Sequence, residues 1–204
     1  MPAALWLAKE PLVLASRSMI RQMLLTAAGV PVEACPADLD ERGLEAREKL
    51  RSAGAVAALL AREKAAAVEK LHRGRLTLGA DQTLALGAER FAKPVDRDAA
   101  REQLRGLRGR SHELHSAIAF VQDGTVLHEH VSVARMLMRN FSDQFLESYL
   151  DACGQAATAN VGAYQIEGLG VQLFERIEGD FFTVLGLPLR EALDFLRRRG
   201  CLAS

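Results

Sequence analysis

HELHSAIAFVQDGTVLHEHVSVARMLM, residues 112–138, is the stretch that decides the fold. It contains two β-rich runs, residues 112–121 and 126–138, on either side of Asp123 and Gly124. An Asp-Gly pair between such runs favours a tight hairpin turn, because both residues tolerate the positive φ angles that the turn requires. The stretch therefore predicts two long antiparallel strands.

The rest of the chain alternates apolar runs with helical patterns, which is typical of an α/β protein. The other expected strands cover residues 12–15, 32–34, 77–80 and 171–177. The expected helices cover residues 19–28, 44–71 with a break at Gly54, 96–107, 142–152 and 188–199. Because the hairpin adds antiparallel pairs to strands that helices separate, we expect a mixed central sheet with flanking helices.

Length and composition predict a single domain over residues 1–204. Of the 204 residues, 49% are hydrophobic, which is enough for the core of one compact domain or of two lobes that share it. Lys plus Arg and Asp plus Glu each number 26, so the formal net charge is zero. Without a strong global field, nucleic acid and anionic lipid are not expected as partners, and a polyanion must be bound by local charges.

The cysteines and the N-terminus favour a cytoplasmic location. Cys35, Cys153 and Cys201 are odd in number and far apart, and they lack the CxxC spacing of many disulfide and zinc sites. The apolar N-terminal stretch is interrupted by Lys9 and Glu10 well short of membrane-spanning length. We therefore expect neither export nor membrane anchoring.

LGADQT, residues 78–83, is the strongest local signal for chemistry. Asp81 comes directly after an apolar strand and two small residues, which places it at a strand's end, where ligands bind in α/β proteins. There it could hold a cation or take a proton from water. The alternative is an Asp that forms a turn through local backbone hydrogen bonds.

Other polar residues could bind an anion or a cation. In LASRSMIR, residues 14–21, a strand leads into a helix start that carries Ser16, Ser18, Arg17 and Arg21, which suits a phosphate, although Ser18 could equally be an ordinary N-cap.

Asp40 and Glu41 could bind a hard cation or act as a base, or they could simply face water. Lys64 and Lys93 are candidates for phosphate oxygens or for solvated surface. P-loop, dinucleotide-binding and α/β-hydrolase motifs are absent, so the residues alone indicate an α/β enzyme with an anion site.

Taken in order, the motifs LASRSMIR, LDER, LLAREKA, GADQT, KP, GRSH and GAYQIEG resemble those of the Maf family of nucleoside triphosphate pyrophosphatases, over residues 12–196. The resemblance implies a two-lobed α/β protein with a deep cleft, similar in fold to inosine triphosphate pyrophosphatases. It further implies a cytoplasmic homodimer that uses Mg²⁺ or Mn²⁺ to hydrolyse nucleoside triphosphates to the monophosphate and pyrophosphate.

The resemblance also implies a role for each matching residue. Asp81 would be the catalytic proton acceptor, and Glu41 would hold the metal together with it. The residues that would contact the triphosphate are Ser16, Arg21, Lys64 and the catalytic Lys93. Such a substrate carries several negative charges, which this neutral chain must offset locally.

Three further positions are those that the family uses to choose the base, and here they are Ile20, Gln82 and Glu167. The branch for dTTP and UTP has Arg, Thr and Gln there, and the branch for 7-methyl-GTP has Trp, Gln and Glu. Gln82 and Glu167 match the second branch, whereas Ile20 offers no π face for a base. The alternatives are a 7-methyl-GTP-selective enzyme and a nucleotide-binding regulator of growth or septation with little catalysis.

Overall fold

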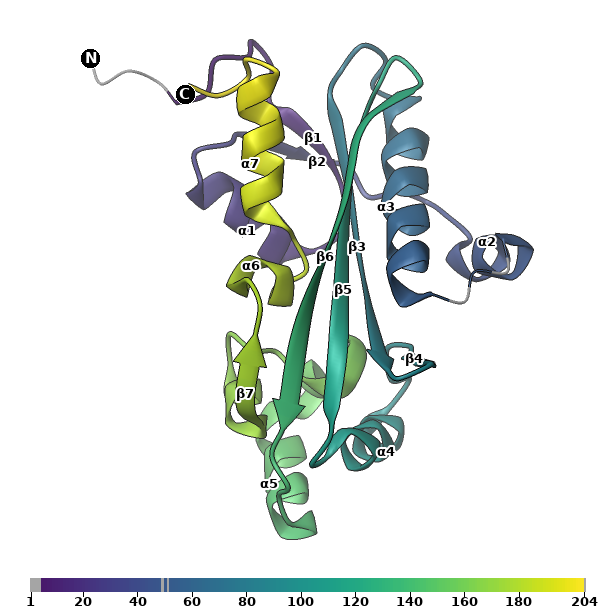
Figure 1. Ribbon diagram of the computed structural model, residues 1–204, viewed down its shortest axis with the longest axis vertical. Helices are drawn as coiled ribbons and strands as arrows, with labels where there is room; N and C mark the ends of the chain where they lie inside the picture. Colours follow the sequence, from purple (N-terminus) through teal and green to yellow (C-terminus); the bar gives the residue numbers. More distant parts are fainter. Residues whose placement is uncertain (1–4, 49, 51, 204) are drawn as a thin grey trace.

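The computed structural model describes residues 5–48, 50 and 52–203 and contains a seven-stranded sheet (Figure 1). The strands are β1 (Leu12–Ala15), β2 (Val32–Ala34), β3 (Thr77–Leu86), β4 (Glu89–Phe91), β5 (Ser111–Gln122), β6 (Thr125–Met138) and β7 (Phe174–Glu178). They lie in the order β2-β1-β3-β5-β6-β7, and β4 pairs with β3. β1 is parallel to β2 and β3, whereas β3, β5, β6 and β7 pair antiparallel in succession. The expected mixed sheet is confirmed.

The hairpin expected at Asp123 and Gly124 joins β5 to β6. Both residues have positive φ angles, 52° and 70°, as a tight turn requires. The pairing extends from Gln122 and Thr125 beside the turn to Ser111 and Leu137 at the far end. These two strands therefore run almost the full length of the molecule (Figure 1).

Helices cover both faces of the sheet, α3 on one side and α1 and α7 on the other (Figure 1). The helices are α1 (Met19–Ala27), α2 (Glu41–Glu48), α3 (Ala53–Glu69), α4 (Arg97–Leu107), α5 (Asp143–Cys153), α6 (Phe181–Val184) and α7 (Leu189–Arg198). Ser18, Asp96 and Ser142 cap α1, α4 and α5 by accepting a backbone N–H from three residues on. None of the described helices has both the length and the apolar composition needed to cross a membrane.

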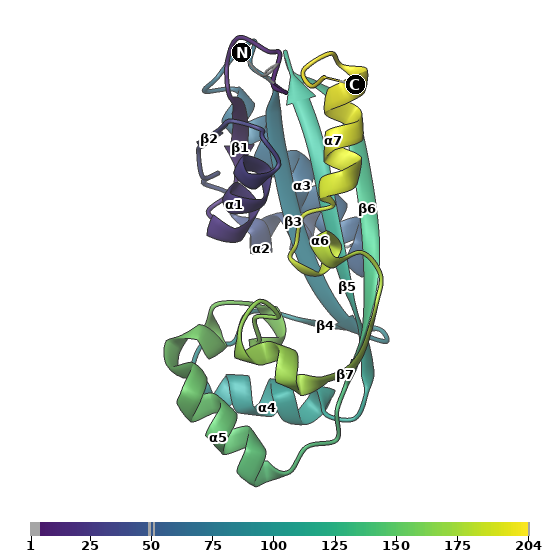
Figure 2. The same cartoon turned by 90° about the vertical axis from the view of Figure 1, so that its left-hand side faces the viewer.

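The molecule has two lobes, which Figure 2 shows in side view. One lobe contains β1, β2, α1, α2, α3 and α7, and the other contains α4, α5 and the 3₁₀ segments. These segments are η1 (Gly154–Thr158), η2 (Val161–Ala163) and η3 (Leu169–Leu173). β3, β5 and β6 extend through both lobes, so the lobes share one sheet. The expected two-lobed arrangement is confirmed.

The long helix expected over residues 44–71 is two helices, α2 and α3. The expected break at Gly54 was wrong, because α3 begins at Ala53 and Gly54 lies in its first turn. Residues 49 and 51 lie outside the described part of the chain. Gly54 instead lets α3 approach the sheet, since a Cβ there would lie 3.3 Å from Nδ1 of His115.

Asp81 does not follow the end of a strand, as the sequence had suggested, but lies in the middle of β3. The strand continues past the expected residues 77–80 because its antiparallel pairing with β5 extends as far as Ala85. The last strand also differs from the expected residues 171–177, because η3 occupies the first part of this range and β7 ends at Glu178.

Gly79 is the point of closest approach between α3 and β3. A Cβ atom at this position would lie 2.0 Å from the carbonyl oxygen of Ala61 and 2.8 Å from the amide nitrogen of Ala65. Beside this point, Ala57 and Ala61 of α3 pack against Ala117 of the neighbouring strand β5, again with small side chains. The backbone of the helix therefore rests directly on the sheet.

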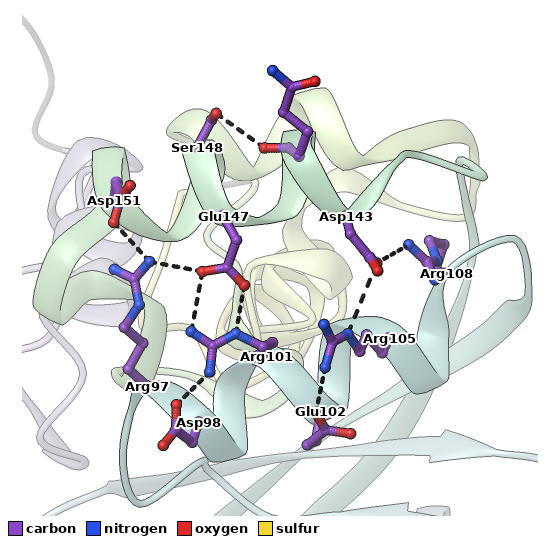
Figure 3. Close-up of polar contacts among 11 residues, drawn as sticks. Arg97, Asp98, Arg101, Glu102, Arg105, Arg108, Asp143, Glu147, Ser148 and Asp151 are labelled. Carbon is purple, nitrogen blue, oxygen red and sulfur yellow. Dashed lines mark hydrogen bonds and ion pairs between the residues drawn. The ribbon is translucent and has the colours of Figure 1, made fainter.

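A cluster of ion pairs joins α4 to α5 in the second lobe (Figure 3). Arg101 and Arg97 both bind Glu147, and Arg97 also contacts Asp151 at 2.7 Å. Hydrogen bonds from Arg101, and then from Arg97, lower the pKa of Glu147 to about 2. The side chains are partly open to solvent, so salt screens these pairs.

The substitution Gly79→Ala is expected to lower the free energy of unfolding by about 3 kcal/mol, because the added methyl group overlaps helix backbone that cannot move freely. Urea denaturation measures the change. Gly106→Ala is the matched control: position 106 lies in α4 with open space around it. That variant is expected to be about 0.5–1 kcal/mol more stable, through helix propensity alone. Equal effects of the two variants would contradict the close contact at Gly79.

The substitution Glu147→Gln is expected to lower the free energy of unfolding at pH 7 and to have less effect as the pH falls. The pKa of Glu147 is lower in the folded than in the unfolded protein, so its contribution is present above the ordinary carboxyl pKa and is lost as the pH falls towards about 2. Denaturation of both proteins across this range, with and without added salt, measures the effect. A difference independent of pH and salt would rule out the ionic contribution.

Candidate active site

A cleft of about 1330 Å³ opens between the lobes and is lined by residues of both. All nine residues to which the family resemblance gives a role line it: Ser16, Ile20, Arg21, Glu41, Lys64, Asp81, Gln82, Lys93 and Glu167. Arg17 and Ser18 line it as well, whereas Asp40 does not: its Oδ1 accepts the backbone N–H of Gly43 at 3.0 Å. Small-molecule sites commonly measure about 300–1,000 Å³, so this cleft has room for a ligand of nucleotide size.

The cleft reaches β3 where the strand has an open edge. The pairing of β1 with β3 ends at Ala15 and Gly79, and the pairing of β4 with β3 begins at Leu84 and Phe91. Between these points, the described pairing of β3 is with β5 alone. Side chains on both faces of residues 81–83 reach the same cleft.

Asp81 faces α3 and is 8% exposed. Its Oδ1 accepts a hydrogen bond of 2.6 Å from Nζ of Lys64, which also lies 2.9 Å from Oε1 of Glu41. Burial raises the pKa of the Asp81 carboxyl, and the positive charges of Lys64 and Arg21 oppose this rise. Oδ2 of Asp81 has no hydrogen-bond partner among the described residues, which leaves it available to accept a proton.

The residues around Lys64 suit a hard divalent cation. Carboxylate oxygens of Glu41 and Asp81 converge on the same positive charge, and Mg²⁺ characteristically uses one or two carboxylates together with water and substrate phosphate. Within the described residues, no cluster of three or more His, Cys, Asp or Glu could form an all-protein cage. The donor set therefore fits a cation that the protein shares with a phosphorylated ligand.

Arg21 forms hydrogen bonds at the open edge of β3. Its Nη1 donates to the carbonyl oxygen of Ala80 at 2.7 Å and to Oγ of Ser16 at 3.1 Å, and its Nε donates to the carbonyl oxygen of Gly186 at 2.8 Å. Burial lowers the pKa of Arg21, while Asp81 and Glu41 oppose this. In the described part of the chain, Nη2 makes no hydrogen bond, so one edge of the guanidinium remains for a ligand.

The two serines before α1 have different tasks. Oγ of Ser18 accepts the backbone N–H of Arg21 at 3.4 Å, so the ordinary N-cap interpretation holds for this residue. Oγ of Ser16 is buried and accepts hydrogen bonds from the backbone N–H of Ser18 and from Arg21. With its lone pairs occupied, Ser16 retains an O–H that can donate to an anion.

The three positions expected to choose the base line the cleft from both lobes. Gln82 faces away from α3, and its Nε2 donates to Oγ of Ser116 and to the carbonyl oxygens of Thr183 and Val184. Its amide nitrogen is thus committed to α6 and β5, which leaves Oε1 as an acceptor. Ile20 packs partly against the core, and Glu167 is exposed on the second lobe.

Lys93 is exposed at the rim of the cleft, on the loop between β4 and α4. Two further cations line the cleft that were not singled out from the sequence, Arg42 and Arg90. Arg42 could have been found from its position beside Glu41. Arg90 gave no signal, because it lies on the unexpected strand β4, and it pairs with Glu45 at 2.7 Å.

Comparisons with known proteins show what the chain is similar to. A family model described as Maf-like protein matches residues 11–199. A nucleoside triphosphate pyrophosphatase of Rhodopseudomonas palustris is 58% identical over 98% of both chains. A 7-methyl-GTP pyrophosphatase of Mesorhizobium japonicum is 50% identical over 95% of this chain and 98% of its own. A solved HAM1 protein from Coxiella burnetii has a TM-score of 0.42 and 16% identity, over 64% of this chain and 74% of its own. Because the family model and the two pyrophosphatases cover nearly the whole sequence, the chain belongs to the Maf-like protein family.

Proposed function

We propose that this protein is a nucleoside triphosphate pyrophosphatase, which hydrolyses its substrate to the nucleoside monophosphate and pyrophosphate. The observation that carries the proposal is the buried carboxylate of Asp81, held by Lys64 and facing Glu41 in a cleft of nucleotide size. Relatives at 50–58% identity carry this activity in their names. The formal net charge of zero supports a small anionic substrate rather than nucleic acid.

In the proposed reaction, water attacks the α-phosphorus, the bond from that phosphorus to the bridging oxygen breaks, and pyrophosphate leaves. Asp81 accepts a proton from the attacking water through Oδ2, while Lys64 at Oδ1 keeps the carboxylate oriented and favours its ionised form. Attack and departure proceed in line, so the main tasks of the protein are positioning and charge neutralisation.

Glu41 and Asp81 are the residues that we expect to hold a divalent cation, Mg²⁺ or Mn²⁺. When bound, such an ion neutralises negative charge on the phosphate oxygens. The protein's own cations complete this neutralisation. Lys93 at the rim, Nη2 of Arg21 and the hydroxyl of Ser16 all face the cleft and would bind the phosphate chain.

The base would lie beside Ile20, Gln82 and Glu167. Oε1 of Gln82 and the carboxylate of Glu167 are hydrogen-bond acceptors, which suit the N–H donors on the edge of guanine better than the carbonyls of a pyrimidine. A guanine-type base, including 7-methylguanine, is therefore the preferred substrate in this proposal. The relative from Mesorhizobium japonicum carries that substrate in its name.

The location and the oligomeric state of the protein are further parts of the proposal. We infer a cytoplasmic protein, which its three unpaired cysteines support, since a reducing compartment keeps thiols free. A homodimer remains the prediction of the family resemblance, and sedimentation of the purified protein would measure it.

The test of the function is turnover. The protein with Mg²⁺ or Mn²⁺ is expected to release pyrophosphate and monophosphate from a panel of normal, methylated and deaminated nucleoside triphosphates. Asp81→Asn should reduce kcat by about 10³-fold through loss of the general base. Asp194→Asn, on the exposed surface of α7, should retain full activity. Release of orthophosphate and diphosphate would contradict the proposal, and tight binding without turnover would favour the regulator.

The substitution Lys93→Ala is expected to lower kcat/KM by about 10²-fold for every base, because the lost charge faces the phosphates that all substrates share. The free energy of unfolding should stay unchanged, since Lys93 is exposed. Lys9→Ala, an exposed lysine outside the cleft, is the matched control. Wild-type kinetics for Lys93→Ala would remove this residue from the site.

A further inference from the structure

The wall of the cleft in the second lobe is a segment with an uncommon backbone conformation. Within residues 161–167, Gly162 and Ala163 have φ angles of 81° and 61°. A positive φ is unfavourable for alanine, so the surrounding structure must hold it in place. At Gly162 a side chain is excluded outright, because a Cβ would lie 2.6 Å from Cε1 of Tyr164. The segment thus has little freedom to adopt another shape.

Three side-chain hydrogen bonds hold this segment. The backbone N–H of Gly162 donates to Oε1 of Gln103, and the hydroxyl of Tyr149 donates to the carbonyl oxygen of Ala163, each at 3.2 Å. The third joins Oη of Tyr164 to Nε2 of His112 at 2.8 Å. The first two anchors come from α4 and α5, whereas the third ties the segment to the shared sheet.

His112 and Tyr164 are 1% and 5% exposed, and both rings pack against Phe174. Burial lowers the pKa of His112 to about 4, so the ring is neutral at physiological pH. Its Nδ1 is buried and has no hydrogen-bond partner within the described structure. An apolar pair of the same shape would avoid that cost. The polar contact between His112 and Tyr164 thus has a cost in stability that an apolar pair would not have.

We infer that His112 is a positioning residue, which acts through Tyr164 to fix the segment that forms the second-lobe part of the base site. Gln165, Ile166 and Glu167 follow Tyr164 directly and line the cleft. The phosphate side lies elsewhere, where Asp81, Glu41 and Lys64 meet at the first lobe. The inference rests on the proposed function, because it assigns the base of a nucleoside triphosphate to this wall.

The two sides of the cleft can be probed separately. Inorganic triphosphate carries the charges of the substrate and no base, so its inhibition constant reports the phosphate side alone. A nucleoside triphosphate analogue with a methylene group between the α- and β-phosphorus resists the proposed cleavage, and its dissociation constant reports both sides without turnover. Both probes are measured with Mg²⁺ on the wild type, Tyr164→Phe, His112→Leu and His112→Gln.

Tyr164→Phe and His112→Leu are expected to raise the dissociation constant of the guanosine analogue about tenfold and to raise KM by a similar factor. A tenfold change corresponds to the loss of about one hydrogen bond. The inhibition constant of inorganic triphosphate and kcat should stay within about twofold, because the phosphate contacts remain. His112→Gln should recover most of the binding, since a glutamine amide can donate or accept near the position of Nε2.

Glu147→Gln is the control for lost stability, because it disturbs the same lobe through ion pairs away from the cleft. It should leave both constants unchanged. The inference would be overturned if the variants bound both probes equally less tightly, or if they bound the guanosine analogue as tightly as the wild type. It would also be overturned if His112→Gln did not recover binding of the guanosine analogue. Failure of the wild type to turn over any nucleoside triphosphate would instead refute the proposed function, while the binding measurements would still decide the role of His112.

Discussion

The direct contact between the backbone of α3 and β3 at Gly79 is the constraint on which the cleft depends. Ala61 and Ala65 of the helix touch this glycine, and Lys64 lies between them in the sequence. The next residue on the same face of the strand is Asp81, so the close approach brings the ammonium group to 2.6 Å from the carboxylate. A buried charge of this kind is tolerable only with a partner. The packing of a helix therefore determines the electrostatics of the site.

The positive and negative side chains that line the cleft are almost equal in number. Its lining cations are Arg17, Arg21, Arg42, Lys64, Arg90 and Lys93, and its lining acids are Asp38, Glu41, Glu45, Asp81 and Glu167. Lys64 and Arg90 already have carboxylate partners, and Arg21 is bound mainly to backbone carbonyls. Six cations against five acids leave little excess positive charge for a triphosphate. A divalent cation brought with the substrate would supply the rest.

Local signals in the sequence were enough for much of this fold. The hairpin followed from Asp123 and Gly124, and the caps at Asp96 and Ser142 marked helix starts correctly, because turns and caps depend on neighbouring residues. The length of β3 did not follow, since it depends on pairing with β5, which lies later in the chain and whose residues are distant in sequence from their partners on β3. Nor did the 3₁₀ segments η1 to η3, which carry weak periodicity.

The candidate site was foreseen in a similar way. The order of short motifs nominated nine residues, and the fold brings all of them to one cleft. The sequence did not indicate which side chains pair with which. Arg21 donates a hydrogen bond to the carbonyl oxygen of Ala80, at an edge of β3 that β1 leaves unpaired. This contact depends on where the pairing of β1 with β3 ends. That boundary is a property of the assembled sheet. The same sheet has a mechanical consequence, because β3, β5 and β6 each extend from one lobe into the other (Figure 2). A wider or narrower cleft would therefore require these three hydrogen-bonded strands to bend together.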